Sequence, residues 1–171
     1  MKSVLAKRKK VSGGRKIISK IEVFIDGASR GNPGLSSAAV VIKQGNEVIL
    51  EQGYFLSNTT NNVAEYTALI KALELLDVLV NDSHSSIRLN AIKPIKWSNV
   101  AIRINSDSEL LVKQMSGEYR VKDSNLKLLF EKARRYMRLF KKMELRHIPR
   151  EQNKEADNLA NRVLNLQEDI A

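Results

Sequence analysis

Residues 21–34 read Ile-Glu-Val-Phe-Ile-Asp-Gly-Ala-Ser-Arg-Gly-Asn-Pro-Gly, an apolar run that ends in Asp26 and opens a glycine-rich turn. The alternation before Asp26, with β-branched side chains, is typical of a β-strand. Residues 37–43 and 47–56 have the same character, and the Gln-Gly-Asn at 44–46 between them is a hairpin signal. Three strands joined by short connections predict an antiparallel meander.

Helices and strands alternate along the rest of the chain. Residues 61–80 carry apolar side chains at helical spacing, and Thr60 or Asn61 is a suitable N-cap. The order β-β-β-α-β-α-α-β-α predicts a mixed α/β sheet with helices packed on its faces. Residues 81–99 are longer than a helix-to-strand loop needs, so a short hairpin or an insertion is expected there. Further strands are predicted at 100–105 and 143–147, and further helices at 108–115, 123–140 and 151–164.

The composition limits the class of protein. A chain of 171 residues with 43% hydrophobic content suits one domain with a core. With no Cys and two His, disulfides, thiolate zinc sites and His-based metal cages are not expected. Oxygen ligands remain, and these suit Mg²⁺, Mn²⁺ or Ca²⁺. No apolar run approaches the roughly 20 residues of a membrane span, and no secretory signal is present, so we expect a soluble cytoplasmic protein.

The positive charge is concentrated at one end of the chain. The net charge is +10, and residues 1–20 contain eight basic residues and no acid. Such arms are often disordered and often bind nucleic acid phosphates, although a simple solvated tail has the same composition. We therefore expect a basic arm over residues 1–20 and one domain over residues 21–171, with a probable insertion at 81–99. The basic residues of the arm are Lys2, Lys7, Arg8, Lys9, Lys10, Arg15, Lys16 and Lys20.

Four acids stand at the ends or starts of predicted elements. Asp26 and Asp107 each end a predicted strand, Glu65 lies one turn into a helix, and Asp157 lies within the last helix. Taken singly, each has an ordinary explanation, such as a turn residue, a helix N-cap or a surface acid. Four carboxylates converging in a basic protein point instead to a pair of divalent metal ions.

The local frames of these acids resemble, in the same order, those of the type 1 ribonuclease H family. The resemblance covers about residues 21–165. It implies the ribonuclease H-like fold, a five-stranded mixed sheet with its first, fourth and fifth strands parallel and helices on both faces. The frames are the turn after Asp26, Thr59-Thr60-Asn61-Asn62-Val63-Ala64-Glu65-Tyr66, Asn105-Ser106-Asp107-Ser108, and the run from His147 to Asp157.

The same resemblance implies an activity and a cofactor. The family hydrolyses the RNA strand of RNA–DNA hybrids with two Mg²⁺ ions, Mn²⁺ being the other candidate, and leaves 5′-phosphate and 3′-hydroxyl ends. It implies that Asp26 bridges both ions and that Glu65, Asp107 and Asp157 divide between them. His147 matches a histidine that helps proton movement or product release, which suits an imidazole titrating at about pH 6.5. A surface or packing histidine is the alternative at that position.

Substrate contacts are implied residue by residue. Asn32, Asn61 and Asn62 match positions that touch the RNA strand across the minor groove, where an amide can both donate to and accept from a 2′-hydroxyl. Helix capping is the alternative for Asn61 and Asn62. Thr60 matches a position that holds a DNA-strand phosphate. Asn153 matches a recurrent polar position that contacts substrate or orients water and neighbouring groups.

The sequence departs from the family pattern in two places. Glu109 stands where the family often has Gln, and a carboxylate can accept from a 2′-hydroxyl but cannot donate to it. The basic, Trp-bearing protrusion of several members is missing, because residues 117–122 pass straight to the next helix. Cleavage of double-stranded RNA therefore stays open. Basic residues that could contact phosphates instead, or form a solvated face, are Lys122, Lys127, Lys132, Arg134, Arg135, Arg138, Lys141 and Lys142.

Two functions of different classes follow. The first is a free-standing, monomeric endoribonuclease acting on RNA–DNA hybrids; the chain's own Met1 favours this over a fragment of a reverse transcriptase. The second is a hybrid- or duplex-binding module with weak or no turnover. Four acids in the family's order favour the enzyme, because a pure binder of a polyanion has no use for them.

Overall fold

A computed structural model describes residues 20–81 and 100–171, so the predicted arm and insertion lie almost wholly outside the described residues. The order of elements is the predicted one. They are β1 (Lys20–Gly31), β2 (Gly34–Gln44), β3 (Glu47–Thr59), α1 (Asn61–Asn81), β4 (Ala101–Ser106), α2 (Glu109–Ser116), α3 (Ser124–Met137), β5 (Met143–His147) and α4 (Lys154–Leu166), with a 3₁₀ turn at Arg150–Gln152.

The strands form one mixed sheet in the order β3-β2-β1-β4-β5. β2 pairs antiparallel with β1 and β3, whereas β4 pairs parallel with β1 and β5, which confirms the predicted arrangement. The prediction that Asp26 ends its strand was wrong. β1 runs on to Gly31, because residues 27–31 stay paired with residues 34–38 of β2. The glycine-rich stretch is therefore the tip of a long hairpin.

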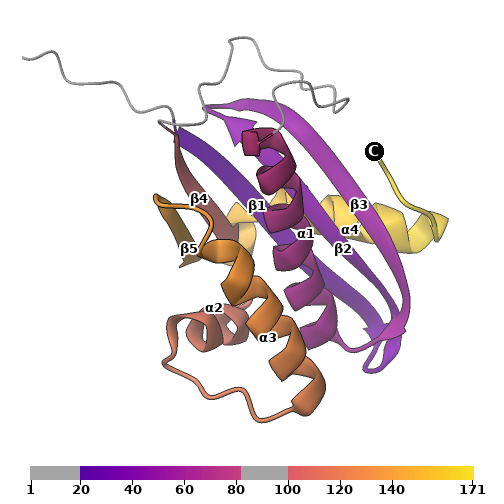
Figure 1. The fold of residues 1–171 in the computed structure, drawn as a ribbon. Helices are drawn as coiled ribbons and strands as arrows, with labels where there is room; N and C mark the ends of the chain where they lie inside the picture. The colour runs from indigo at the N-terminus through magenta and orange to yellow at the C-terminus, as the bar shows by residue number, and fades with distance from the viewer. Residues whose placement is uncertain (1–19, 82–99) are drawn as a thin grey trace, which may run out of the picture.

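Helices cover both faces of the sheet, with α1 and α3 in front and α4 behind in Figure 1. Alternate residues of β1 point to opposite faces, as the pleat requires. Val23 and Ile25 belong to the larger core on the α1 side. Phe24 and Ala28 pack instead on the smaller core formed with α4. Asp26 has the same parity as Phe24 and Ala28, so it lies on the α4 face.

Two glycines let helices approach the sheet closely. A Cβ on Gly27 would overlap the backbone of Ala64 and Glu65 in α1. A Cβ on Gly53 would meet the side chain of Val163 in α4. The first contact is backbone against backbone, so it sets how near the start of α1 lies to Asp26.

The segment after α4 returns to the sheet and lies along β3. The backbones of Gly53 and Ile170 exchange two hydrogen bonds, of 2.7 and 2.9 Å. The Phe55 N–H donates to the Asp169 carboxylate at 2.7 Å. Among the described helices, none combines the length and apolar character that a membrane crossing requires.

We expect Gly27→Ala and Gly53→Ala to differ in kind. Gly53→Ala should lower the free energy of unfolding by about 1–3 kcal/mol through overpacking, and Gly27→Ala by more, since backbone cannot turn away. Only Gly27→Ala should also weaken divalent-cation binding, because it pushes Glu65 away from Asp26. Urea denaturation and calorimetric titration with Mg²⁺ would measure both effects. Equal cation binding by the two variants would contradict this account of Gly27.

Candidate active site

Two of the four acids lie side by side at the end of paired strands. The parallel ladder of β1 and β4 ends with Ile25 opposite Ser106, so Asp26 and Asp107 are the next residues on each strand. Ser108 caps α2, its hydroxyl accepting the Leu111 N–H at 3.3 Å. Asp107 is therefore not used as the helix cap, which removes the ordinary explanation for that acid.

Glu65 is brought to the same point by α1. Thr60 starts this helix, because its hydroxyl accepts the Val63 N–H at 3.3 Å and its carbonyl accepts the Ala64 N–H at 3.0 Å. The close approach at Gly27 then sets Glu65 beside Asp26. As a result, one carboxylate oxygen each from Asp26, Glu65 and Asp107 lie within 4.8 Å of one another.

This cluster is electrostatically strained. Asp26 and Glu65 are each only 6% exposed. Burial, together with the negative charges of Asp107 and Asp157, raises the pKa of Asp26 to about 7. Burial likewise raises the pKa of Glu65 well above its ordinary value, with further repulsion from Asp26 and Asp107. A cation among them would favour the ionised form of these carboxylates at neutral pH.

The donor set fits a divalent cation. Oε2 of Glu65 is buried and has no hydrogen-bond partner, which is costly unless something positive meets it. All the converging ligand atoms are carboxylate oxygens, and Mg²⁺ prefers a few of these together with water and phosphate oxygens. Asp26, Glu65 and Asp107 could therefore hold Mg²⁺ or Mn²⁺.

Asp157 lines the same cavity and is paired with the side chain of Arg150. It stands in the first turn of α4, and its Oδ1 accepts from Nη2 of Arg150 at 2.7 Å. The positive charge of Arg150 opposes the rise in the pKa of Asp26. Sequence analysis missed Arg150; the available signal was a basic residue seven positions before an expected metal ligand. The cavity has a volume of about 280 Å³, and its lining includes Asp26, Glu65, Asp107, Asp157, Arg30, Asn61, Arg150 and Asn161.

Asn153 holds the cluster together from beneath. It is completely buried. Its Nδ2 donates to the carbonyl of Ile25 at 2.9 Å and to Oδ1 of Asp107 at 2.9 Å. We therefore place Asn153 as a residue that orients Asp107, which was one reading of its position, and not as a direct substrate contact.

The predicted RNA-contacting residues gather at the rim. Oδ1 of Asn32, in the hairpin turn, accepts the backbone N–H of Asn61 at 3.2 Å, which ties the turn to the start of α1. Asn61 is exposed and lines the cavity, and Asn62 beside it is half-buried. Thr60 is occupied in capping α1 but is still partly exposed.

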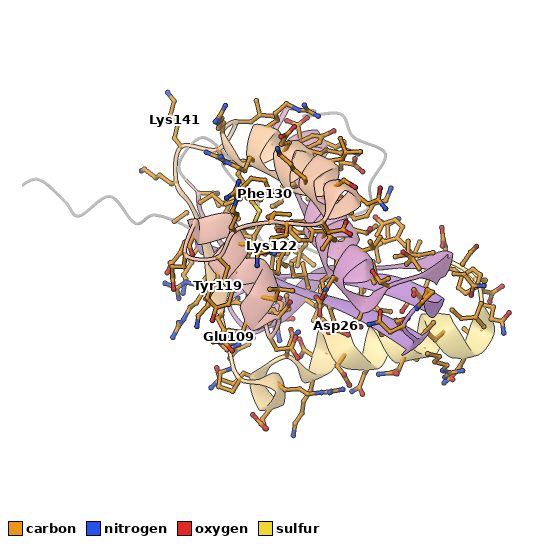
Figure 2. The ribbon with its side chains drawn as sticks, turned by 90° about the horizontal axis from the view of Figure 1, so that it is seen from below. Asp26, Glu109, Tyr119, Lys122, Phe130 and Lys141 are labelled. Carbon is orange, nitrogen blue, oxygen red and sulfur yellow. The ribbon has the colours of Figure 1, made fainter. Side chains whose placement is uncertain are left out.

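Glu109 and His147 lie on the α2 side of the acids. Glu109 is bound to Nζ of Lys113 at 2.6 Å, and this hydrogen bond lowers the pKa of the Glu109 carboxyl. Lys113 also lies over the ring of Tyr119 at 4.9 Å. Figure 2 shows Glu109 and Tyr119 on the same side of Asp26. His147 is exposed at the end of β5, opposite Ser106 in the ladder, and is not among the residues lining the cavity.

The basic residues around α3 are mostly exposed. Lys132 is the exception, because it is half-buried and bound to Glu74 at 2.8 Å. Figure 2 shows Lys122 toward Tyr119 and Asp26, with Lys141 at the far end of the molecule. The exposed members of the set are Lys122, Lys127, Arg134, Arg135, Arg138, Lys141 and Lys142.

We expect the stability of the cation-free protein to depend on pH through Asp26. Because its folded pKa is raised to about 7, folding binds a proton there, and the associated stability is lost as pH rises through about 7. In EDTA, Asp26→Asn should match wild type near pH 4 and exceed it by up to about 4 kcal/mol near pH 8. Mg²⁺ at pH 8 should reduce this difference in the free energy of unfolding by stabilising wild type. Chemical denaturation across this pH range measures the difference, and a difference that does not change with pH would contradict the role given to Asp26.

Similar proteins agree with this fold. A family model described as "Reverse transcriptase-like" matches residues 89–163. The Ribonuclease HI of Halobacterium salinarum is 33% identical over 146 residues, covering 85% of this chain and 64% of that protein. The chain thus spans somewhat less than two thirds of that relative.

Solved structures of ribonuclease H1 proteins align with this chain over nearly their whole length. LC11-RNase H1, isolated from compost, is 37% identical with a TM-score of 0.75, covering 87% of this chain and 98% of that one. A structure of LC11-RNase H1 in complex with an RNA/DNA hybrid aligns at 35% identity with a TM-score of 0.71, covering 86% and 98%. Sequence motifs, sheet topology and these similarities lead to one conclusion: the chain belongs to the type 1 ribonuclease H family.

Proposed function

We propose that this protein is an endoribonuclease that hydrolyses the RNA strand of RNA–DNA hybrids, leaving 5′-phosphate and 3′-hydroxyl ends. The observation that carries the proposal is the convergence of Asp26, Glu65 and Asp107 within 4.8 Å. A buried, unpartnered Glu65 oxygen adds to it, since such a cluster is costly for a protein that only binds. The hybrid complex of LC11-RNase H1, a similar protein, supports the choice of substrate.

Four carboxylates would share the work at the reacting phosphate. Two Mg²⁺ ions held by Asp26, Glu65, Asp107 and Asp157 would supply an activated water and stabilise charge on the phosphate and on the leaving 3′-oxygen. Asn153 holds the Asp107 carboxylate in place through its 2.9 Å bond. His147, near Asp107 on the neighbouring strand, would pass a proton to the leaving oxygen or assist product release.

Recognition of RNA would use the amides at the rim. The carbonyl of the Asn32 side chain is occupied by the Asn61 N–H, which leaves the Asn32 NH₂ to meet a 2′-hydroxyl. Asn61, unlike Asn32 and Asn62, lines the cavity that holds the acids, so its amide would face the substrate there. Glu109, already bound to Lys113, brings less net negative charge to the substrate than a lone carboxylate would.

The rival function is a binding module with little or no turnover. Both functions would use the exposed cations of α3 for phosphates, so binding alone does not separate them. Because the basic protrusion is absent, double-stranded RNA is a second candidate substrate, and the assay below includes it. We further propose a monomer acting in the cytoplasm.

Asp107→Asn should separate the two functions. We expect hybrid cleavage in Mg²⁺ to fall by at least about 100-fold, because even outer partners of metal ligands typically contribute 10–100-fold. Hybrid binding should be kept or improved, since one negative charge is removed. Glu151→Gln, an exposed acid outside the cavity, is the matched control.

The assay uses end-labelled RNA–DNA hybrid beside RNA–RNA and DNA–DNA duplexes, each in Mg²⁺ and in EDTA. Cutting of the hybrid's RNA strand that is lost in EDTA supports the enzyme. Hybrid binding by wild type without cutting in Mg²⁺ or Mn²⁺ would instead favour the binding module.

His147→Ala tests the proton-transfer role. We expect kcat to fall by roughly 100-fold with hybrid affinity unchanged, because positioned acids and bases contribute at least that much. His84→Ala is the control, because His84 stands in none of the sequence frames that resemble the family. Single-turnover and multiple-turnover cleavage would measure chemistry and product release in turn, and wild-type rates in both for His147→Ala would remove His147 from the mechanism.

A further inference from the structure

The cavity that holds the acids runs between residues 26–30 of β1 and one face of α4, and this part of the cavity is called the groove below. Asp157, Asn161 and Asn165 recur every four residues and so lie on one face of α4. Asp26 and Arg30 lie on the facing side of β1, four residues apart. Ala28 and Asn161 line the cavity between its acidic end and Arg30, so Arg30 stands at the far end of the groove.

Arg30 differs from the other arginine of this cavity. Arg150 is bound to the carboxylate of Asp157. Nη2 of Arg30 donates only to the neutral side-chain oxygen of Asn165, and no ion pair joins Arg30 to any acid in the described part of the chain. The Arg30 side chain is exposed. Its charge is thus held at the end of an acidic groove without a carboxylate partner.

The backbone at Arg30 is fixed by the hairpin tip. Arg30 pairs with Leu35 across the β1–β2 ladder. A Cβ on Gly34 would clash with the carbonyl oxygen of Arg30, so the two strands approach closely there. Because its backbone is fixed and its Nη2 is bound to Asn165, the guanidinium group of Arg30, with its remaining N–H donors, has a defined position.

A nucleic-acid strand in this groove would meet strong repulsion at its acidic end. The strand would need a positive group at the other end of the groove. A guanidinium suits this, because its planar fork of donors binds phosphate oxygens in pairs. Four strand residues span roughly 13 Å, so Arg30 would reach a phosphate other than the one at the carboxylates. The groove thus has one end for the reacting phosphate and another for a neighbouring phosphate.

We propose that Arg30, positioned by Asn165, binds a backbone phosphate of the RNA strand one or two positions from the scissile one and so sets the register of cleavage. The assignment to RNA rests on the function proposed above. Asn165 is a positioning residue, because it acts through Arg30.

The test is hybrid binding in EDTA, where no cleavage occurs, followed by fluorescence anisotropy. The hybrids carry one neutral methylphosphonate at successive positions of the RNA strand. We expect Arg30→Ala to weaken binding of the unmodified hybrid about tenfold, as for a hydrogen bond to a charged group. The slope of log affinity against log salt should fall by roughly 0.7–0.9. One methylphosphonate position should weaken wild type but not Arg30→Ala.

Matched variants sharpen the result. Arg162→Ala removes an exposed arginine of α4 that does not line the cavity, and should behave as wild type. Asn165→Ala should give a smaller loss at the same methylphosphonate position, and Arg30→Lys should restore part of the affinity. Identical methylphosphonate profiles for wild type and Arg30→Ala would overturn the proposal. If wild type does not cleave the hybrid in Mg²⁺ but still shows the Arg30-dependent methylphosphonate position, the result counts against the enzyme function and not against the phosphate site.

Discussion

The backbone contact between Gly27 of β1 and the start of α1 is the constraint on which the site depends. Because no side chain separates them, Glu65 reaches Asp26, while the parallel ladder of β1 and β4 brings Asp107 alongside. Three independent elements therefore deliver one carboxylate each to a single point. A shift of any one of them by a fraction of a residue would change the metal ligand set. The absence of a side chain at Gly27 is therefore essential to the position of Glu65.

Charge is balanced locally and not by the basic character of the protein as a whole. The cluster is buried against the sheet, so distant lysines affect it little, and burial is the first cause of the raised pKa values of Asp26 and Glu65. Arg150 meets Asp157 directly, yet Glu65 keeps a buried oxygen without a partner. The free protein is thus left short of positive charge at one spot, and binding a cation there relieves strain already present in the fold.

Much of this could be predicted from sequence because it follows from local signals. Alternation before Asp26, the Gly45-Asn46 turn and the Thr60 cap gave the order of elements, and resemblance gave the sheet topology. Strand ends were harder: the glycines after Asp26 suggest a turn, but pairing with β2 keeps residues 27–31 in the strand. Arg30 carries no local signal at all, since its contact with Asn165 arises only when α4 packs against β1. Arg150 offered only its spacing of seven residues from Asp157.

The return of the chain onto β3 after α4 has a consequence for the outer edge of the sheet. β3 is an edge strand, and its unpaired N–H and C=O groups could template the addition of a strand from another molecule. Ile170 takes up both backbone groups of Gly53, and Asp169 takes the N–H of Phe55. The protein thereby shields the middle of this edge from intermolecular β-pairing and places a negative charge beside it.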